Sequence, residues 1–318
     1  MTRTTAAGVT SADLDRLDRL AAERGVRLET NAPLGPLTTL RVGGTADRLA
    51  TPRSRDELLA VLALARDADL PPFILGNGSD LVVADAGIRG LVVRNRAREV
   101  SIARTTLRAD GGTAMAQLVK RCTAQALRGL EFGISIPGSL GGAVWANAGA
   151  HGGEMKDVVT EVEVWDPRDG ALHALDTAAC GFAYRESRFK HGTEVVISAT
   201  LALQPGEADA IAATVAAHQA QRRATQPVAD QNAGSVFRNP PDDHAGRLIE
   251  VAGLKGHRIG SAQVSTLHAN FIVTDREASA ADVRALGDRV RAEVARRFDV
   301  ELQYEIEFVG DWPVEAPR

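Results

Sequence analysis

The segment richest in possible chemistry is a glycine-rich stretch from Gly133 to Gly153. Seven of the chain's 30 glycines fall within it, interleaved with Ile, Leu, Val and Trp. Glycine has no Cβ and tolerates positive φ, so a ligand can approach its backbone closely. This density favours a backbone packed against a flat apolar ligand and a phosphate. The alternative is a set of tight turns in a chain that tolerates glycine.

A second glycine loop, Gly76-Asn77-Gly78-Ser79-Asp80, follows an expected short strand at 73–75. Successive backbone N–H groups in such a loop can bind phosphate oxygens, and the Asn and Ser side chains add neutral donors. The loop has neither the Gly-Lys-Ser/Thr of a Walker loop nor the GxGxxG dinucleotide pattern. Taken alone, it also fits a plain turn.

Two further segments bring polar side chains together. Residues 184–190, Tyr-Arg-Glu-Ser-Arg-Phe-Lys, hold three bases and one acid. Such a run is typical of a solvated surface, whereas Arg185 beside Tyr184 could clamp a carboxylate. In segment 232–240, Ser235 follows a glycine. It lies outside any GxSxG elbow, so it is either a reactive serine or an ordinary turn residue.

The C-terminal segment 301–308 alternates polar with apolar residues. Successive strand residues face opposite sides, so one face is expected to hold Glu301, Gln303, Glu305 and Glu307. The alternative is a strand with a solvated acidic face. His151 and His268 have no companion at metal-ligand spacing, and no metal is expected.

Composition sets the class of protein. The chain has 318 residues, 44% hydrophobic and 25% charged, which fits a globular protein of two or three domains. A net charge of -4 argues against nucleic acid as the main partner. No apolar window is long enough to span a membrane, and the first 20 residues do not resemble a signal peptide. Cys122 and Cys180 fit free thiols in a reducing compartment. A cytoplasmic location is expected.

Periodicity and capping signals predict the elements that position these segments. Helices are expected at 11–24 with Ser11 as the cap, 54–67, 114–127, 208–223, 245–253 and 279–298. Strands are expected at 46–50, 73–75, 91–93, 101–104, 106–109, 158–166, 195–203, 269–274 and 301–309. Strand and helix alternate in the first part, as in a small α/β unit. Boundaries near 95 and 220 divide the chain into domains 1–95, 96–220 and 221–318.

Six segments in this order resemble the UDP-N-acetylenolpyruvoylglucosamine reductase family, over about 25–310. They are TTLRVGG (38–44), ILGNGSDLVV (74–83), GISIPGSLGGAVWANAGAHGGE (133–154), YRESRFK (184–190), NAGSVFRNP (232–240) and YEIEFVG (304–310). The resemblance implies an α+β fold. It comprises a vanillyl-alcohol-oxidase-type FAD-binding region of two subdomains and a C-terminal α/β substrate domain.

The resemblance also implies the site residues. Non-covalent FAD is expected to contact Gly76, Asn77, Gly78, Ser79, Asp80, Ile136, Gly138, Ser139, Gly142 and Asn147. The expected catalytic residues are Arg185, Ser235 and Glu305. The nucleotide sugar is expected to contact Tyr184, Arg222, Arg238, Asn239 and His268.

The reaction implied is reduction of UDP-N-acetylglucosamine enolpyruvate to UDP-N-acetylmuramate in peptidoglycan precursor synthesis, with NADPH as the hydride donor. Arg185 would pair with the substrate carboxylate, a protonated Glu305 would donate to the same group, and Ser235 would give its proton to C2. No Tyr lies between Tyr184 and Tyr304, so the chain resembles members without the tyrosine-bearing loop. The alternatives are an oxidase of a sugar or hydroxy acid on the same fold, and a non-catalytic nucleotide-sugar sensor.

Overall fold

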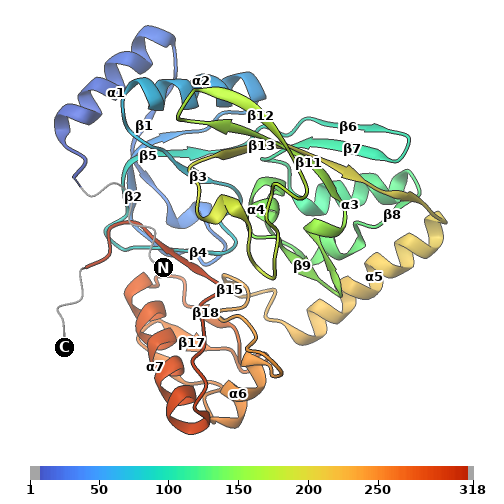
Figure 1. Ribbon diagram of the computed structural model, residues 1–318. Coiled ribbons are helices and arrows are strands. Elements are labelled where there is room, and N and C mark those ends of the chain that lie inside the picture. Colours follow the sequence, from blue (N-terminus) through green and yellow to red (C-terminus); the bar gives the residue numbers. More distant parts are fainter. Residues whose placement is uncertain (1–7, 314–318) are drawn as a thin grey trace.

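The computed structural model describes residues 8–313. Residues 1–7, which begin the N-terminal segment that does not resemble a signal peptide, lie outside this range. Residues 314–318, at the end of the predicted third domain, also lie outside it. The chain forms three neighbouring regions: a sheet with helices α1 and α2, a larger antiparallel sheet with α3, α4 and α5, and a region containing α6 and α7 (Figure 1). Within the described range, no helix is long and apolar enough to cross a membrane.

The first region has a four-stranded sheet in the order β1-β2-β5-β3. Its strands are β1 (Glu29–Pro33), β2 (Thr45–Ala50), β3 (Phe73–Leu75) and β5 (Ile88–Arg94), and β5 is parallel to both β2 and β3. Helix α2 (Arg55–Asp67) is capped by Ser54, as expected. Helix α1 (Ser11–Arg24) is capped by Thr10 rather than Ser11. Thr10 forms a reciprocal capping box with Asp13, which satisfies two free backbone donors at once.

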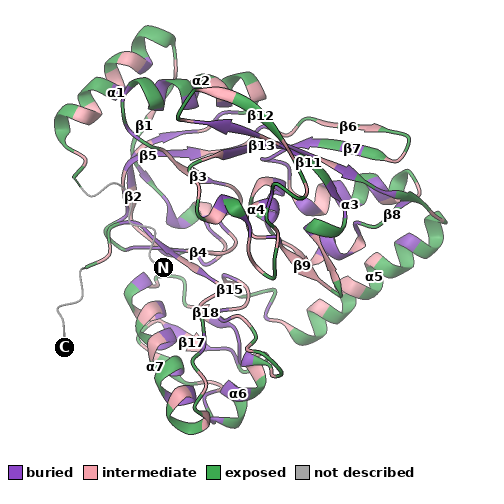
Figure 2. Cartoon of the chain, in the orientation of Figure 1, coloured by how far each residue is buried: buried purple, intermediate pink, exposed green. Residues whose placement is uncertain are grey.

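The second region has an antiparallel sheet in the order β12-β11-β13-β7-β6. Its strands are β6 (Val100–Ala103), β7 (Thr106–Asp110), β11 (Val159–Asp166), β12 (Ala171–Asp176) and β13 (Val195–Ala202). The central strands β11 and β13 are largely buried (Figure 2). Their apolar side chains pack in one cluster with those of α3 (Met115–Ala124) and α4 (Leu140–Trp145).

The glycine-rich stretch folds into short elements rather than one long loop. In order they are the 3-10 helix η2 (Glu131–Ser135), α4, the hairpin of β9 (Gly149–Ala150) and β10 (Gly153–Glu154), and the 3-10 helix η3 (Met155–Asp157). Cys122 and Cys180 are buried and free. Burial raises the pKa of the Cys122 thiol to about 12. Both cysteines therefore serve as packing residues.

Helix α5 (Ala208–Thr225) leads into the third region, whose sheet has the order β15-β18-β17-β16. These strands are β15 (Gln231–Asn232), β16 (Arg258–Ile259), β17 (Ala262–Val264) and β18 (Ile272–Thr274). Helices α6 (Ala245–Val251) and α7 (Ala280–Phe298) pack in the same apolar cluster. Short elements elsewhere are η1 (Gly35–Leu37), η4 (Arg188–Lys190), and the paired β8 (Leu127–Arg128) and β14 (Gln204–Pro205).

The C-terminal strand differs from its prediction. Only β19 (Glu307–Val309) is regular, and it pairs in parallel with β4 (Leu81–Val83), directly after the first glycine loop. The expected strand over 301–309 is interrupted because its first half pairs with a different segment. In that half, Arg238 N donates to Gln303 O and Glu305 N donates to Val236 O. The chain end thus joins the third region to the first.

The predicted strand over 269–274 is also shorter, beginning at Ile272. Asn270 turns its side chain onto neighbouring backbone instead of continuing a ladder, and its own N–H donates to His268 Nδ1. The predicted boundaries near 95 and 220 stay predictions. Residues 221–318 are not a self-contained sheet unit, because β19 completes its pairing with β4.

Candidate active site

The two glycine-rich segments lie in direct contact. A Cβ added at Gly76 would lie 2.4 Å from the Oγ of Ser139, and Asn77 Nδ2 donates to Pro137 O at 3.2 Å. Ser139 in turn caps α4 by accepting from Gly142 N. The structure therefore brings the loop 76–80 beside segment 136–142, and their expected contact with one shared ligand stays a prediction.

Glycine is required in this contact by space and by conformation. Gly78 has a φ of +62°, and a Cβ there would lie 2.6 Å from Leu37 O. Gly141 N donates to Gly111 O at 2.8 Å, and a Cβ on Gly141 would lie 3.1 Å from that oxygen. We call loop 76–80 and segment 136–142 the glycine cradle. A glycine-rich backbone with the neutral side chains of Asn77 and Ser79 fits a flat cofactor with a diphosphate, such as FAD.

Asn147 is fully buried and holds the loops of the site together. Its Nδ2 donates to Glu154 Oε2 and to Ala183 O, at 3.0 and 2.8 Å, and its Oδ1 accepts from Lys156 N. Because these protein bonds engage both ends of the amide, Asn147 acts by positioning the β9–β10 hairpin and the segment before Tyr184. The predicted direct contact with the cofactor gains no support from this geometry.

Arg185 and Glu305 form an ion pair, with Nε and Oε1 2.6 Å apart. Arg185 Nη2 also donates to Gly149 O at 3.0 Å, and its guanidinium lies 5.0 Å from the ring centroid of Tyr184. The backbone of Arg185 has a φ of +55°, which is rare for a side-chain-bearing residue and is typical of functional sites. Glu305 accepts a hydrogen bond here, whereas the sequence-based expectation made it a donor to substrate.

The backbone that follows Ser235 is hydrogen-bonded to the backbone of Glu305, a member of this pair. The residue after Ser235, Val236, accepts from Glu305 N at 2.8 Å. Asn270 fixes the same segment: its O accepts from Val236 N, its Oδ1 accepts from Phe237 N, and its Nδ2 donates to Phe237 O. Asn270 is buried. Sequence reasoning missed it, because its role depends on residues more than 30 positions away.

A cavity of about 380 Å³ opens beside Ser235. Its lining includes Ser235 and two of the residues expected to bind the nucleotide sugar, Asn239 and His268. The other lining residues are His244, Gly246, Arg247, Glu250, Leu267, Ala269 and Asn270. The structure therefore joins the expected proton donor to a hollow of ligand size.

The other expected substrate residues lie outside this lining. Arg238 has a buried Nε without a hydrogen-bond partner, and its Nη2 lies 3.8 Å from Glu186. Arg222 is on α5, where its Nε donates to Gln226 Oε1. Tyr184 is exposed beside Arg185.

The interpretation of 184–190 as a solvated run is wrong for Lys190. Its side chain is only 8% exposed, its Nζ lies 3.1 Å from Glu307 Oε1, and it stacks over the ring of Trp145 at 4.4 Å. Neither Lys190 nor Glu307 was predicted as a site residue. A charge run is normally solvated, and only the fold shows that this lysine meets an acid from the C-terminal strand.

Asp80 lies beside the same charges. Glu307 N donates to Asp80 O at 2.9 Å. Burial raises the pKa of the Asp80 carboxyl well above its usual value, and the negative charges of Glu305 and Glu307 raise it further. The cradle thus meets Arg185, Glu305, Lys190 and Glu307 at its Asp80 end.

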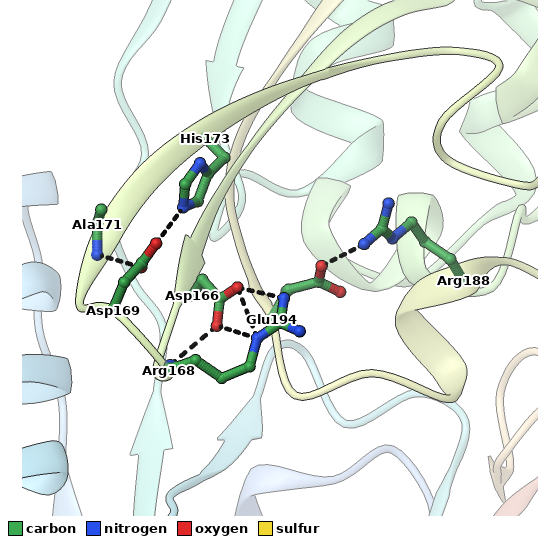
Figure 3. Close-up of polar contacts among 7 residues, drawn as sticks. All are labelled: Asp166, Arg168, Asp169, Ala171, His173, Arg188 and Glu194. Carbon is green, nitrogen blue, oxygen red and sulfur yellow. Dashed lines mark hydrogen bonds and ion pairs between the residues drawn. The ribbon is translucent and has the colours of Figure 1, made fainter.

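A separate polar cluster at the β11–β12 turn has a structural explanation (Figure 3). Arg168 bonds both oxygens of Asp166, and Asp169 contacts His173 Nε2 at 2.9 Å. The carboxylates of Asp166 and Asp169, with His173, are close enough to consider a metal site. Each of the three already has a protein partner, and Asp169 and His173 are exposed. The contacts stabilise the hairpin.

Comparison with known proteins gives a consistent result. A family model described as UDP-N-acetylenolpyruvoylglucosamine reductase, C-terminal domain, matches residues 226–309, and one described as FAD binding domain matches 46–176. A protein of Symbiobacterium thermophilum named UDP-N-acetylenolpyruvoylglucosamine reductase 2 is 45% identical over 306 residues, covering 95% of this chain and 98% of its own. A reductase of the same name, without the number, from Moorella thermoacetica is 47% identical, covering 93% and 99%.

A solved structure gives the same result. The crystal structure of UDP-N-acetylenolpyruvylglucosamine reductase from Thermus caldophilus matches with a TM-score of 0.77 and 36% identity, covering 89% of this chain and 99% of that one. The fold class expected from the sequence, α+β with an FAD-binding region and a separate C-terminal domain, is confirmed.

Proposed function

The chain belongs to the UDP-N-acetylenolpyruvoylglucosamine reductase family, and from this premise we propose that it reduces UDP-N-acetylglucosamine enolpyruvate to UDP-N-acetylmuramate. It is a flavin-dependent oxidoreductase that uses FAD and NADPH. The relatives described above are all named as reductases, so the oxidase and sensor alternatives are not carried further. Peptidoglycan precursor synthesis suits a cytoplasmic enzyme, which we include in the proposal.

One observation carries the residue assignments. The Arg185–Glu305 pair and the Ser235 segment meet beside the glycine cradle, because 303–305 pairs with 236–238 while Glu307 pairs with the end of the cradle. Three segments that are far apart in sequence are thereby placed at one point. This is the arrangement that a reaction on a cradle-bound cofactor needs.

FAD, when bound, would supply the two-electron redox chemistry that links NADPH to the C3 carbon of the enolpyruvyl group. Gly76, Ser139 and the backbone of the cradle would hold it. Reduction of the double bond also needs one proton at C2. The overall change is substrate plus NADPH plus one proton, giving product and NADP⁺.

The chain's own side chains handle the charge and that proton. As electrons enter the double bond, negative charge develops on C2 and the neighbouring carboxylate, and preformed donors stabilise it. Arg185 supplies the charged donor, and Glu305 holds its guanidinium in place. Ser235 Oγ gives its proton to C2, and a water or neighbouring acid returns one. Asn270 keeps Ser235 in position by fixing the backbone that follows it.

The non-covalent cofactor assignment is tested by releasing the flavin. The purified protein is expected to be yellow, and heat denaturation is expected to leave FAD in the supernatant. Anaerobic NADPH is expected to bleach the visible absorbance, and UDP-N-acetylglucosamine enolpyruvate to restore it. A colourless protein that takes up no FAD, or a reduced protein that oxygen reoxidises rapidly while the enolpyruvyl sugar does not, would contradict the proposal.

A further inference from the structure

Of the six segments that carry the family resemblance, TTLRVGG (38–44) is the one that supplies no residue to the proposed mechanism. The segment forms no regular helix or strand. Thr38 fixes its turn from within, because Thr38 Oγ1 donates to Gly35 O and accepts from Arg41 N, both at 3.1 Å. Hydrogen bonds of side chains to backbone therefore determine the shape of this segment.

The next residue, Thr39, directs its polar groups at two other segments. Its backbone N–H donates to Gly78 O, in the glycine cradle, at 3.0 Å. Its Oγ1 donates to Asn232 O at 2.7 Å and lies 3.5 Å from Gly78 O. Thr39 is thus bonded at once to the cradle and to the segment that leads into Ser235.

Asn232, at the end of β15, shapes the turn that carries Ser235. Its Oδ1 accepts from Gly234 N at 2.9 Å, and Gly234 has a φ of +80°. Its Nδ2 donates to two carbonyls of the loop 227–230. The Asn232 side chain therefore holds the turn together, and its carbonyl is the point at which Thr39 attaches. A shift of the Thr39–Asn232 contact would move the turn, and Ser235 with it.

Other contacts anchor segment 38–44 in the third region. Leu40 and Val42 are each 1% exposed and pack in the apolar cluster of α6 and α7, which also holds Val236. Leu40 O accepts from Thr274 Oγ1 at 3.0 Å. These anchors remain when the Thr39 hydroxyl alone is removed. We therefore expect such a change to displace the Ser235 turn while the regions stay folded and in contact.

We propose that Thr39 is a positioning residue whose hydroxyl sets the distance between Ser235 and a ligand held at the glycine cradle. This inference rests on the proposed function, in which Ser235 gives its proton to C2. A proton donor must lie within hydrogen-bond reach of its acceptor, and a misplacement of about 1 Å can slow a reaction about 10²-fold. Thr39 acts through the Asn232 carbonyl, without touching the substrate.

The variant T39V tests this, because valine keeps the shape of threonine and removes the hydroxyl. The two half-reactions are followed by anaerobic stopped-flow absorbance of the FAD-loaded protein. Reduction by NADPH is expected to proceed at the rate of the wild type. Reoxidation by UDP-N-acetylglucosamine enolpyruvate is expected to slow about tenfold or more. The solvent deuterium isotope effect on reoxidation is expected to rise, because transfer of the exchangeable Ser235 proton limits the rate more strongly.

Two further variants separate positioning from general stabilisation. T39S keeps the hydroxyl and is expected to restore both the reoxidation rate and the isotope effect. The matched control is S279A. Ser279 Oγ donates to Asp85 Oδ2 at 2.8 Å and so joins the same two regions, but Asp85 follows β4, whereas the cradle loop precedes it. S279A is expected to leave both half-reactions unchanged. Thermal unfolding measures the stability of all three variants.

The inference would be overturned if T39V lost its fold or its FAD, slowed both half-reactions equally, or left reoxidation and its isotope effect unchanged. Slow reoxidation that T39S does not restore, or that S279A shows equally, would also overturn it. Each of these results leaves the proposed function intact. By contrast, a wild-type protein that NADPH reduces and the enolpyruvyl sugar fails to reoxidise would contradict the proposed function itself.

Discussion

Arg185 combines a strained backbone with a paired side chain. Its φ is +55°, and its guanidinium donates to both Glu305 and Gly149 O. A fork of fixed geometry can hold Glu305 with one edge and leave another nitrogen for a substrate carboxylate. Lysine has the charge without the fork, so the charge and the geometry can be separated by substitution.

We expect Arg185→Lys to retain FAD and to slow reoxidation by the enolpyruvyl sugar at least about tenfold, because one bidentate donor is lost from the stabilisation of developing charge. Reduction by NADPH should change little. Stopped-flow absorbance of each half-reaction measures this. If the variant mainly loses FAD, Arg185 is a structural residue rather than a catalytic one.

The Lys190–Glu307 pair gives a second prediction at the residue scale. Lys190→Met leaves Glu307 unpaired beside Asp80, and breaking a buried pair typically costs about 3–5 kcal/mol. Since Glu307 keeps some exposure, we expect the lower end of that range, measured by urea unfolding. The double variant Lys190→Met with Glu307→Gln is expected to recover part of the loss. A Lys190→Met variant as stable as the wild type would show that the pair contributes nothing.

At the scale of elements, the glycine cradle depends on the contact between loop 76–80 and segment 136–142. Gly76→Ala would push a Cβ to 2.4 Å from Ser139 Oγ, and that serine caps α4. We therefore expect at least about a tenfold weaker FAD affinity with little loss of fold, as measured by fluorescence titration of the flavin-free protein. Gly152→Ala is the control, because no atom lies within 4 Å of its added Cβ, although its φ of +83° adds some strain. Equal FAD affinity in both variants would argue against the cradle.

The elements themselves show what sequence can predict. Helices with caps, such as α2 after Ser54 and α7 after Ser279, begin where their capping signals indicate. Long strands such as β11 and β13 were also found by alternation. Strand 301–309 was predicted too long, because alternation of burial continues through residues that exchange one partner segment for another. The hydrophobic pattern indicates which face of a strand is buried. It carries no information about which segment pairs with that strand.

The same limit applies to predicting the site: the sequence shows the motifs but not all of their contacts. The motifs carrying Arg185, Ser235 and Glu305 were recognisable in sequence, and the structure brings their segments together. The roles of Asn270 and Lys190 were not predictable, since each depends on a partner distant in sequence. Asn147 was predicted beside the cofactor, yet its bonds hold two loops together. A motif identifies a position more readily than it identifies what that side chain contacts.

At the scale of the whole molecule, β19 joins the C-terminal region to the first region. Val309 packs with the core of the first sheet, whereas Phe308 packs in the α6–α7 cluster and contacts the rings of Tyr304 and Trp312. The site lies at this junction, because Glu305 and Glu307 are on the same segment. A change that destabilises the junction should therefore also disturb the geometry of the site.

Phe308→Ala is expected to reduce the free energy of unfolding by about 3–5 kcal/mol, the usual cost of removing a buried aromatic ring. We also expect weaker FAD binding, because the β4–β19 pairing follows directly from the cradle. Thermal unfolding and flavin titration measure the two effects. A destabilised variant with unchanged FAD affinity would show that the junction and the cradle are independent.

The most direct test of the central claim, that Ser235 donates the proton to the substrate, separates the two half-reactions in Ser235→Ala. Under anaerobic conditions, reduction by NADPH is expected to stay within about twofold of wild type. Reoxidation by UDP-N-acetylglucosamine enolpyruvate is expected to slow by about 10²–10⁴-fold, the usual contribution of a general acid. An equal slowing of both half-reactions, or no slowing of reoxidation, would contradict the account.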